Sequence, residues 1–579
     1  MLNGSTLNGF ALNGVAGAIA QQQVAPAPSF VWSALVTLGG DDVSARLVGT
    51  VTVDREEGAA GVADFALFYE PGAAVPVDIA NRAVTIDLIS TAQGETTVAR
   101  LFTGVVAEPR WNALARTLTV TCTDSLQQRV EALSVEQIDT LVGGQWTADV
   151  FEPVDGRSRW DYAQERLQSR PASLDCSAAG ELRVTSWYAA AAAHVVFGPG
   201  TTLYESIAVD LAQQAAVTNR VELDVQYRYS RFREHRQNYR WTHPGTSGLT
   251  GISGFCAWRT ESSELPTVEM IIDSVSGGGQ VAVEAALYRL PLTMPNPCGD
   301  GAAWINDNAD LLLGAQWTGA VRWVQQATES YRLTIATEAG IDPASRVISR
   351  GGTAFEIEAR NGWESSLRPI SVGETGDLIQ GGTTGNYGAP GDRDDEARRA
   401  AALSQQLAAA QAELIAAHRQ TRVTWSVPTP MALAVDLVHT LEIDDQYVKA
   451  RGKCSRRVDR LDIDSGACIT DLTVSIMRGG GESDPLVVPD RTAGSGGGGG
   501  GIAPASDLPT QLGGRFTSPT YDDDLLGFAG NYSDVQVSEL FPRRLDVLAD
   551  EIPAEDRDEY TATREQTYRV AIPNDLLEL

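Results

Sequence analysis

Alternation of apolar and polar residues is the feature that most constrains this chain, and it dominates residues 30–135. Five runs show it, separated by turn-forming residues: "FVWSALVTL", "FALFY", "AVTIDLI", "RLFTGVV" and "TLTVTCT". A period of two is typical of strands with one buried face, and short strands at this spacing indicate an antiparallel barrel or sandwich. We expect a short helix at 124–133 to end the region, with Asp124 as its N-cap.

Length and charge limit the classes of protein to which the chain can belong. Its 579 residues are too many for one core, and about three to five domains are expected. Acidic residues number 75 against 45 basic ones, a formal net charge of −30. Such a surface repels phosphate backbones and anionic lipid. We expect no secretory signal and no membrane segment, because the first 40 residues carry no charged side chain and the longest apolar run is short.

The cysteines favour buried, reduced thiols rather than a zinc ribbon or a disulfide scaffold, because no two of them have CxxC spacing. Synthesis inside a cell agrees with this interpretation. The six cysteines are Cys122, Cys176, Cys256, Cys298, Cys454 and Cys468.

Changes in pattern divide the chain into six parts, and the prediction is a mainly β, α+β, multi-domain protein. Three Leu-Asn-Gly repeats at residues 2, 7 and 12 favour tight bends, and "GSGGGGGG" at 494–501 is typical of a flexible linker. The last 75 or so residues are acidic, and we expect them to order only against a partner. The parts are an arm and linker (1–29), a first β domain (30–135), a mixed α/β middle domain (136–245), an inserted loop-rich β domain (246–345), a second β domain (346–480), and a flexible C-terminal extension (481–579).

Four further helices are expected from apolar spacing and capping residues. One begins after Ser158, a candidate cap, and others cover 203–217 and 320–331. The clearest runs over 392–419. It has acids at its N-terminus and His418 and Arg419 at its C-terminus, as the helix dipole favours. Its small apolar seam suits close packing and consists of Ala400, Leu403, Leu407, Ala410, Leu414 and Ala417.

The stretch "QYRYSRFREHRQNYRW" at 226–241 has five arginines and five aromatic residues. Arginines interleaved with rings are also typical of single-stranded nucleic-acid grooves. A strand is expected to continue through Tyr227 and Tyr229, with an aromatic face and a basic face, and the later arginines to follow around a turn. Because the chain has 30 surplus acids, we favour an internal or intersubunit ladder of arginine–carboxylate pairs over nucleic-acid binding.

No catalytic constellation, cofactor site or metal site is identified, and we expect no enzyme. The five histidines (His194, His235, His243, His418 and His439) form no HExxH motif, and no GxSxG elbow is present. His235 or His243 could coordinate a metal, but solvated loop histidines are commoner. The acidic clusters at 442–445, 462–464 and 522–524 lack the EF-hand register, so solvated turns are the favoured interpretation. Tryptophans could stack on sugars, although burial is more usual: Trp241, Trp258, Trp304, Trp317 and Trp323.

Several segments resemble the hub proteins of phage tails. "VTVDREEGAAGVADFALFY", "RLFTGVV" and "TVTCTDSLQQRV" resemble the first tube-like domain of that family, and "WDYAQERLQSRPASLDCSAAGELRVTSW" is similar to its middle domain. The helix at 392–419 and the strands ending in "YVKARGKCSRRVDRLDIDSGACITDLTVSI" resemble its second tube-like domain. The resemblance covers roughly residues 30–480 and rests on pattern and order rather than on one diagnostic motif.

The resemblance implies a structural protein of the virion, at the tail tip or baseplate. Three chains would form a homotrimeric ring of six tube-like domains, matching a hexameric tail tube. DNA would pass through its acidic lumen during ejection without specific binding. The expected partners are tail tube and distal tail proteins, and a tail fibre or central spike protein. A carbohydrate-binding or cell-wall-degrading tail-tip protein is the alternative, and a spike-type component of a contractile secretion system is a third possibility.

Overall fold

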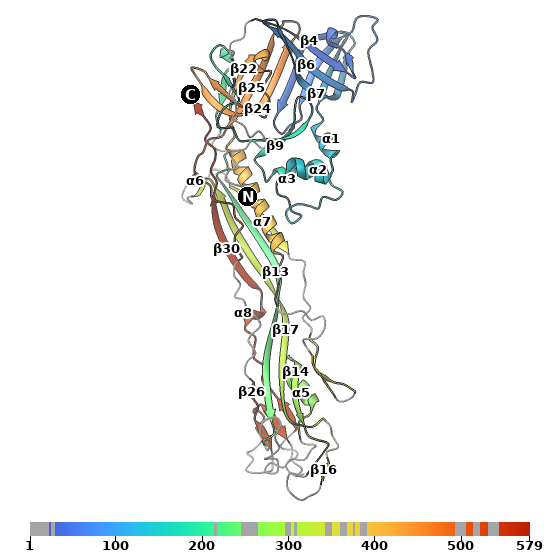
Figure 1. Cartoon of the computed structure of the whole chain (residues 1–579), viewed down its shortest axis with the longest axis vertical. Helices are drawn as coiled ribbons and strands as arrows, with labels where there is room; N and C mark the ends of the chain where they lie inside the picture. Colours follow the sequence, from blue (N-terminus) through green and yellow to red (C-terminus); the bar gives the residue numbers. More distant parts are fainter. Residues whose placement is uncertain are drawn as a thin grey trace.

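The protein is an elongated molecule with a broad head and a long, narrow stalk (Figure 1). The computed structural model describes residues 22–24, 29–212, 217–244, 265–295, 303–305, 310–341, 350–358, 367–374, 377–381, 391–491, 505–512, 522–530 and 543–579. Most of its regular structure is β, which confirms the predicted mainly β, α+β, multi-domain class.

One half of the head is a curled antiparallel sheet that we call the first β unit. The five runs predicted as strands are strands, and their alternate residues build one core that includes Val36, Phe65, Ile86 and Val120. The sheet order is β4-β5-β8-β7-β6-β2-β3. Its strands are β2 (Phe30–Leu38), β3 (Asp41–Asp42), β4 (Leu47–Glu56), β5 (Val62–Phe68), β6 (Ala83–Ala92), β7 (Glu95–Asn112) and β8 (Thr117–Thr123), with a 3₁₀ turn at Ser44–Arg46.

A small helical unit lies beneath the first β unit (Figure 1). Ser158 caps α3 as predicted, with its side chain accepting a hydrogen bond from Asp161 N. The N-cap of α1 is Ser125 rather than Asp124; the Asp124 carboxylate accepts N–H groups from both Leu126 and Gly61, which ties the start of the helix to the sheet. The unit contains α1 (Leu126–Glu131), α2 (Val135–Val142), α3 (Arg159–Leu167), β9 (Ala172–Cys176) and β10 (Leu182–Ser186).

The other half of the head is the second β unit, which buries Trp425, Leu441 and Val474 in its core. The predicted helix at 203–217 is wrong: a 3₁₀ turn at Tyr204–Ser206 leads into β12, which pairs with β22. Pairing with a neighbouring strand outweighs the helical spacing of the apolar residues here. The strands are β1 (Gln22–Gln23), β11 (Val195–Phe197), β12 (Ala208–Asp210), β22 (Thr421–Pro428), β23 (Thr440–Asp444), β24 (Lys449–Asp462), β25 (Cys468–Ile476) and β31 (Leu577–Glu578), with a 3₁₀ turn at Thr429–Ala432.

The two β units are joined edge to edge. Strand β24 pairs with β23 and β25 of its own unit, and its second half, Arg456–Asp462, pairs with Glu56–Thr50 of β4. The head is therefore crossed by one continuous sheet.

The stalk is built on two very long strands, β13 (Arg220–Thr242) and β17 (Leu312–Ala336), which pair over their length. Two predictions fail here: 320–331 is strand rather than helix, and β13 continues through Arg231–Arg240 without a turn. This ribbon also links the predicted middle and inserted domains, whose boundaries remain a prediction. The other strands of the sheet are β14 (Val281–Arg289), β18 (Arg350–Glu358), β21 (Gly391–Arg393), β26 (Ser506–Asp507) and β30 (Tyr560–Arg569).

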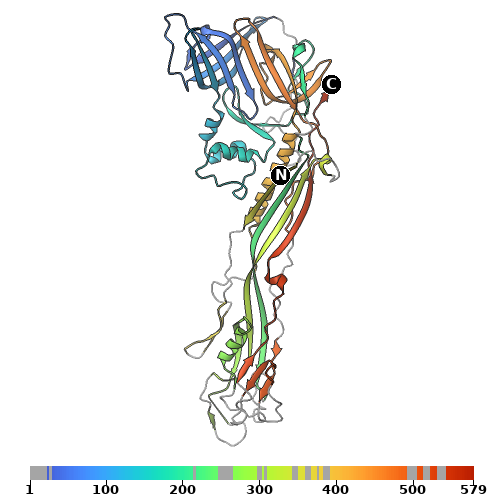
Figure 2. The same cartoon turned by 180° about the vertical axis from the view of Figure 1, so that it is seen from behind.

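Helix α7 (Glu396–Ala417) packs along the end of the stalk nearest the head (Figures 1 and 2). Its position confirms the predicted helix, with Asp395 as the N-cap. Four members of the predicted seam (Leu403, Leu407, Ala410 and Leu414) are buried against β13 and β17, and the two terminal alanines are half-buried.

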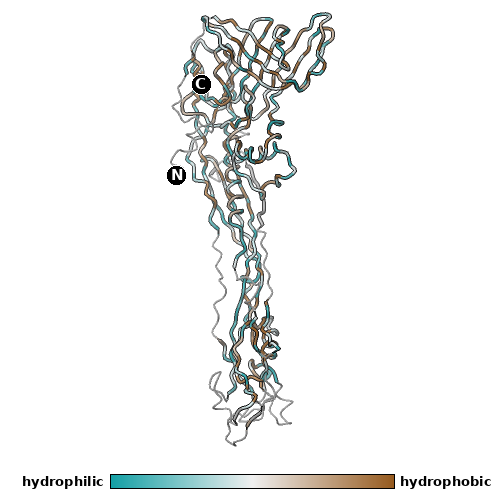
Figure 3. The backbone as a smooth tube through the Cα atoms, turned by 45° about the vertical axis from the view of Figure 1, so that its right-hand side comes forward, coloured by the Kyte–Doolittle hydropathy of each residue, from teal (hydrophilic) through white to brown (hydrophobic). Residues whose placement is uncertain are grey.

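The far end of the stalk has its own apolar core around Trp241, Trp317 and Phe528. Hydrophobic segments appear in the head and again at this end (Figure 3). The elements there and along the stalk are α5 (Val268–Ser276), α6 (Glu338–Ile341), α8 (Ala554–Arg557), β15 (Thr293–Pro295), β16 (Ala303–Ile305), β19 (Ser371–Val372), β20 (Leu378–Ile379), β27 (Thr510–Leu512), β28 (Gly527–Gly530) and β29 (Arg544–Asp546).

The C-terminal part of the chain returns from the far end of the stalk to the head. Strand β30 runs parallel to β17, and β31 pairs with β24. The described part of 481–579 thus packs on its own chain, contrary to the expectation that it orders only on a partner. The glycine linker at 494–501 and the Leu-Asn-Gly repeats lie outside the described residues. None of the helices in the described part combines the length and apolarity that a membrane crossing requires.

Candidate functional site

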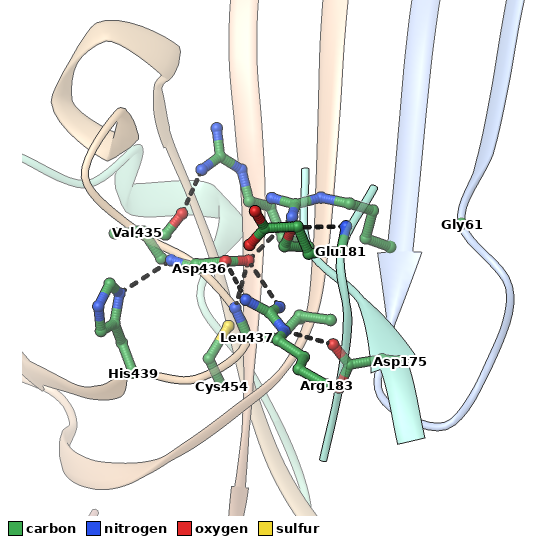
Figure 4. A network of polar contacts seen from close by, with 12 residues as sticks. Gly61, Asp175, Glu181, Arg183, Val435, Asp436, Leu437, His439 and Cys454 are labelled. Carbon is green, nitrogen blue, oxygen red and sulfur yellow. Dashed lines mark hydrogen bonds and ion pairs between the residues drawn. The ribbon is translucent and has the colours of Figure 1, made fainter. Parts of the chain in front are cut away.

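A polar junction joins the three units of the head, and Asp436 lies at its centre (Figure 4). Arg55 of β4 donates to Asp436 Oδ1 at 2.8 Å, and Arg183 of β10 donates to Oδ2 at 2.5 Å and to Oδ1 at 3.1 Å. Arg183 also donates to Asp175 Oδ1 of β9 at 2.7 Å. One carboxylate of the second β unit therefore binds both the first β unit and the helical unit.

The protonation states of this junction follow from burial and neighbouring charges. Burial alone would raise the pKa of Asp436, but hydrogen bonds from Arg183 and the charges of both arginines lower it below the usual range. His439 Nδ1 accepts the Asp436 N–H at 2.9 Å, and burial together with the nearby His194 ring lowers the pKa of His439 to about 4. The carboxylate is charged and the imidazole neutral at pH 7.

A second buried ion pair lies where α7 meets the head. Arg419 Nη2 is 2.7 Å from Glu57 Oε1, and its guanidinium stacks 5.0 Å from the Trp187 ring. The sequence interpretation of Arg419 and His418 as helix-end cations needs correction. Arg419 forms an ion pair with Glu57 of the first β unit. His418 Nδ1 lies 3.1 Å from the Arg478 carbonyl oxygen, and burial lowers the pKa of His418. The Arg419–Glu57 pair ties the C-terminal end of α7 to the first β unit of the head.

The basic stretch of β13 forms the internal ladder that the sequence predicts. Arg233 is 3.1 Å from Asp392, and Arg236 is 2.9 Å from Glu284. Glu234 is shared between Arg236 and the buried Arg322 of β17. Further along, Arg240 forms a bidentate pair with Asp507, and Arg231 lies 3.8 Å from the Tyr560 ring centroid. The guanidiniums of this ladder are engaged with the protein's own carboxylates and rings, which does not favour the nucleic-acid alternative.

A buried carboxylate holds the chain segment before the glycine linker against the stalk. Glu329 is 1% exposed and accepts hydrogen bonds from the hydroxyls of Tyr229 and Tyr331. Arg491 lies 3.3 Å from Glu329, pairs with Asp394, and stacks 4.5 Å from the Tyr229 ring. No sequence motif indicates this cluster, since its members come from four distant segments.

His235 and His243, the two histidines considered as metal ligands, lie too far apart to share a metal ion. His235 lies on β13 and His243 directly follows its end, so eight residues of extended chain separate them by about 26 Å. His235 Nε2 is 3.7 Å from Asp550, and burial lowers the pKa of His243 to about 4. In the described part of the chain, no three His, Cys, Asp or Glu side chains gather as metal ligands would.

The acidic clusters and the cysteines have structural roles. Asp462 accepts the N–H groups of Asp464 and Ser465, and Asp522 accepts that of Asp524, so both confirm the turn interpretation. Four cysteines are free and buried, as predicted: Cys122, Cys176, Cys454 and Cys468. Cys256 and Cys298 lie outside the described residues.

The tryptophans considered for sugar stacking are mostly in cores. Trp241 and Trp317 are each 1% exposed, which leaves no face for a sugar, and Trp323 is partly buried. Trp258 and the side chain of Trp304 lie outside the described residues.

Comparison with known proteins gives structural similarity only. No family model matches the chain, and no curated protein matches it. The tail protein from Neisseria meningitidis MC58 is similar over 77% of this chain and 96% of its own length, with 9% identity and a TM-score of 0.36. The 43 kDa tail protein of prophage MuSo2 from Shewanella oneidensis is similar over 76% and 98%, with 11% identity and a TM-score of 0.36. A prophage tail protein from Listeria monocytogenes EGD-e is similar over 76% and 94%, with 6% identity and a TM-score of 0.29.

Proposed function

We propose that the chain is the structural hub of a phage tail, located at the tail tip or baseplate. Three copies form a ring that joins a hexameric tail tube to tail-tip fibres or a central spike, and DNA passes through its acidic lumen during ejection. The protein acts by assembly rather than by catalysis. Its partners are the tail tube, distal tail proteins and a fibre or spike protein.

The observation that carries this proposal is the pairing of β24 with β4. It places two β units side by side in the head of one chain, within one continuous sheet. Three such chains supply six β units around an axis, which matches a sixfold tube. The Asp436 junction supports this role, because it holds the two units and the helical unit in one arrangement.

The charge distribution supports the acidic lumen. The chain carries 75 acidic against 45 basic residues, and many arginines are engaged in internal pairs along the stalk and at the head junction. A negatively charged wall repels phosphates, so DNA slides along it without adhering.

The test is the mass of the purified full-length protein in solution, measured by light scattering, followed by electron microscopy of the particles. We expect three times the chain mass and a ring of six similar β units with a central opening. A stable monomer or dimer, or an opening of the head ring lined by arginine, would contradict the proposal.

A further inference from the structure

The four-strand segment of the stalk nearest the head has two outer edges, and we call this segment the upper stalk sheet. Its order is β30-β17-β13-β18. Strand β18 pairs with Arg220–Arg228 of β13, and β30 pairs with Ala327–Ala336 of β17, which lies opposite the same stretch of β13. Among the described residues, no strand pairs with the far side of β18 or of β30.

The backbone of β30 shows which of its groups point outward. Arg569 N donates to the Asp484 carboxylate and its carbonyl accepts from Asp484 N, whereas Val570 N donates to Ala336 of β17. Odd-numbered residues therefore direct their N–H and C=O groups away from β17, because the pattern alternates along a strand. These residues include Thr561, Thr563, Glu565 and Thr567.

An edge of this kind is normally blocked. Natural proteins protect exposed edges with proline, bulges or short strands, because a row of unpaired amides attracts another strand. Strand β30 has ten residues, no proline and an unbroken register with β17, and only Arg564, Glu565 and Arg569 add charge. Such an edge fits a partner strand.

The two faces of the sheet indicate how it is oriented. One face is apolar and covered by α7, with Val225, Tyr227 and Tyr331 buried beneath the helix. Apart from Ala336, the described side chains of the opposite face are polar: Arg220, Glu222, Asp224, Gln226, Arg228, Thr328, Ser330, Arg332, Thr334, Thr561, Thr563, Glu565, Thr567 and Arg569. A sheet with one face covered by a helix and one polar face can line a water-filled space.

We propose that β30 of one copy pairs with β18 of the next copy, so that three upper stalk sheets close into one tube with α7 outside. The strand directions permit this. Strand β30 is parallel to β17, β17 is antiparallel to β13, and β18 is parallel to β13, so β30 and β18 run in opposite directions and can form an antiparallel pair. The tube has about twelve strands, more than the eight whose interior side chains can fill.

The threefold count rests on the function proposed above, but the choice of partner strand is independent of it. Pairing β30 with β30 around a twofold axis would leave the edge of β18 open in both copies. Pairing β30 with β18 joins unlike edges, and such contacts form a closed ring when the rotation between successive copies closes, as a threefold rotation does. The polar face of the sheet, which carries both acidic and basic side chains, then lines a bore through the stalk that continues from the lumen of the head.

Hydrogen exchange in the unaltered, full-length assembly is the first test. We expect the amides of Thr561, Thr563, Glu565 and Thr567 to exchange more than about tenfold more slowly than amides of an open edge. A trimer in which these amides exchange freely would overturn the tube and leave the proposed hub intact. Failure to form a trimer would overturn the hub itself, and a β30–β30 dimer would overturn both.

A proline substitution is the second test, because an outward-facing N–H at an edge is where a strand tolerates proline. In Thr563→Pro we expect the neighbouring edge amides to exchange at the rate of an open edge, while thermal unfolding stays close to that of the matched control, Thr563→Ala. In Ala562→Pro the lost N–H faces β17, so this variant should unfold earlier. Unchanged protection of Thr561 and Glu565 in Thr563→Pro would refute the pairing.

Discussion

Asp436 shows how one residue can hold several units together. Its carboxylate is bound by Arg55, whose side chain is 5% exposed, and by Arg183, whose side chain is 18% exposed. Removing one partner of a buried ion pair leaves the other charges unpaired at a cost of about 3 kcal/mol. We therefore expect Asp436→Asn to lower the free energy of unfolding of the head by about 3 kcal/mol, as measured by urea titration.

The matched control for that substitution is Glu108→Gln. Glu108 pairs with Arg110 in the same head, but the two side chains are 55% and 75% exposed. Exposed pairs contribute less than about 1 kcal/mol. If the two variants lose equal stability, the buried junction is not what joins the units.

The junction also predicts a dependence on pH. The pKa of His439 is about 4 in the folded protein, because of burial and the charges of His194, Lys453 and Arg183, with Asp436 opposing them. An unfolded histidine has a pKa of about 6.5, so below that pH the unfolded chain binds a proton that the folded chain does not. Stability should fall as the pH drops from about 6.5 to about 4, by at most about 3 kcal/mol for this group. Urea titrations at several pH values should show a shallower slope in His439→Gln; an unchanged slope would exclude His439 as the cause.

At the scale of elements, the sequence predicts those helices and strands that are determined by the pattern of their own residues. Period-two alternation predicts the strands of the first β unit, and capping residues with a small seam predict α7. Of the expected helices, 320–331 is strand, and the described part of 203–217 is a 3₁₀ turn followed by β12, because pairing with the distant β13 and β22 determines their structure. Local spacing carries no information about such partners.

The difference between local pattern and distant pairing also explains which parts of the candidate site could be predicted from the sequence. The ladder of arginine–carboxylate pairs could be predicted, because 226–241 contains five arginines in a chain rich in acidic residues. The Asp436 junction is not, because Arg183 and Arg55 are 253 and 381 residues away in sequence. Which acid meets which arginine depends on β24 lying beside β4, and that pairing is a property of the tertiary fold.

At the scale of the whole molecule, the last segment of the chain ties the stalk to the head. Residues 560–579 cover the edge of β17, place Tyr568 and Ile572 in the core beneath α7, and end as β31 on β24. Deleting 560–579 uncovers this apolar surface and the amides of Ala327–Ala336, so we expect thermal unfolding to begin several degrees lower and the truncated chain to aggregate.

Adding a peptide of residues 560–579 should restore the unfolding temperature, because the edge of β17 remains available to it. A peptide of the same composition in scrambled order is the control. A truncated chain as stable and soluble as the intact one would show that the returning segment is not part of the folded stalk.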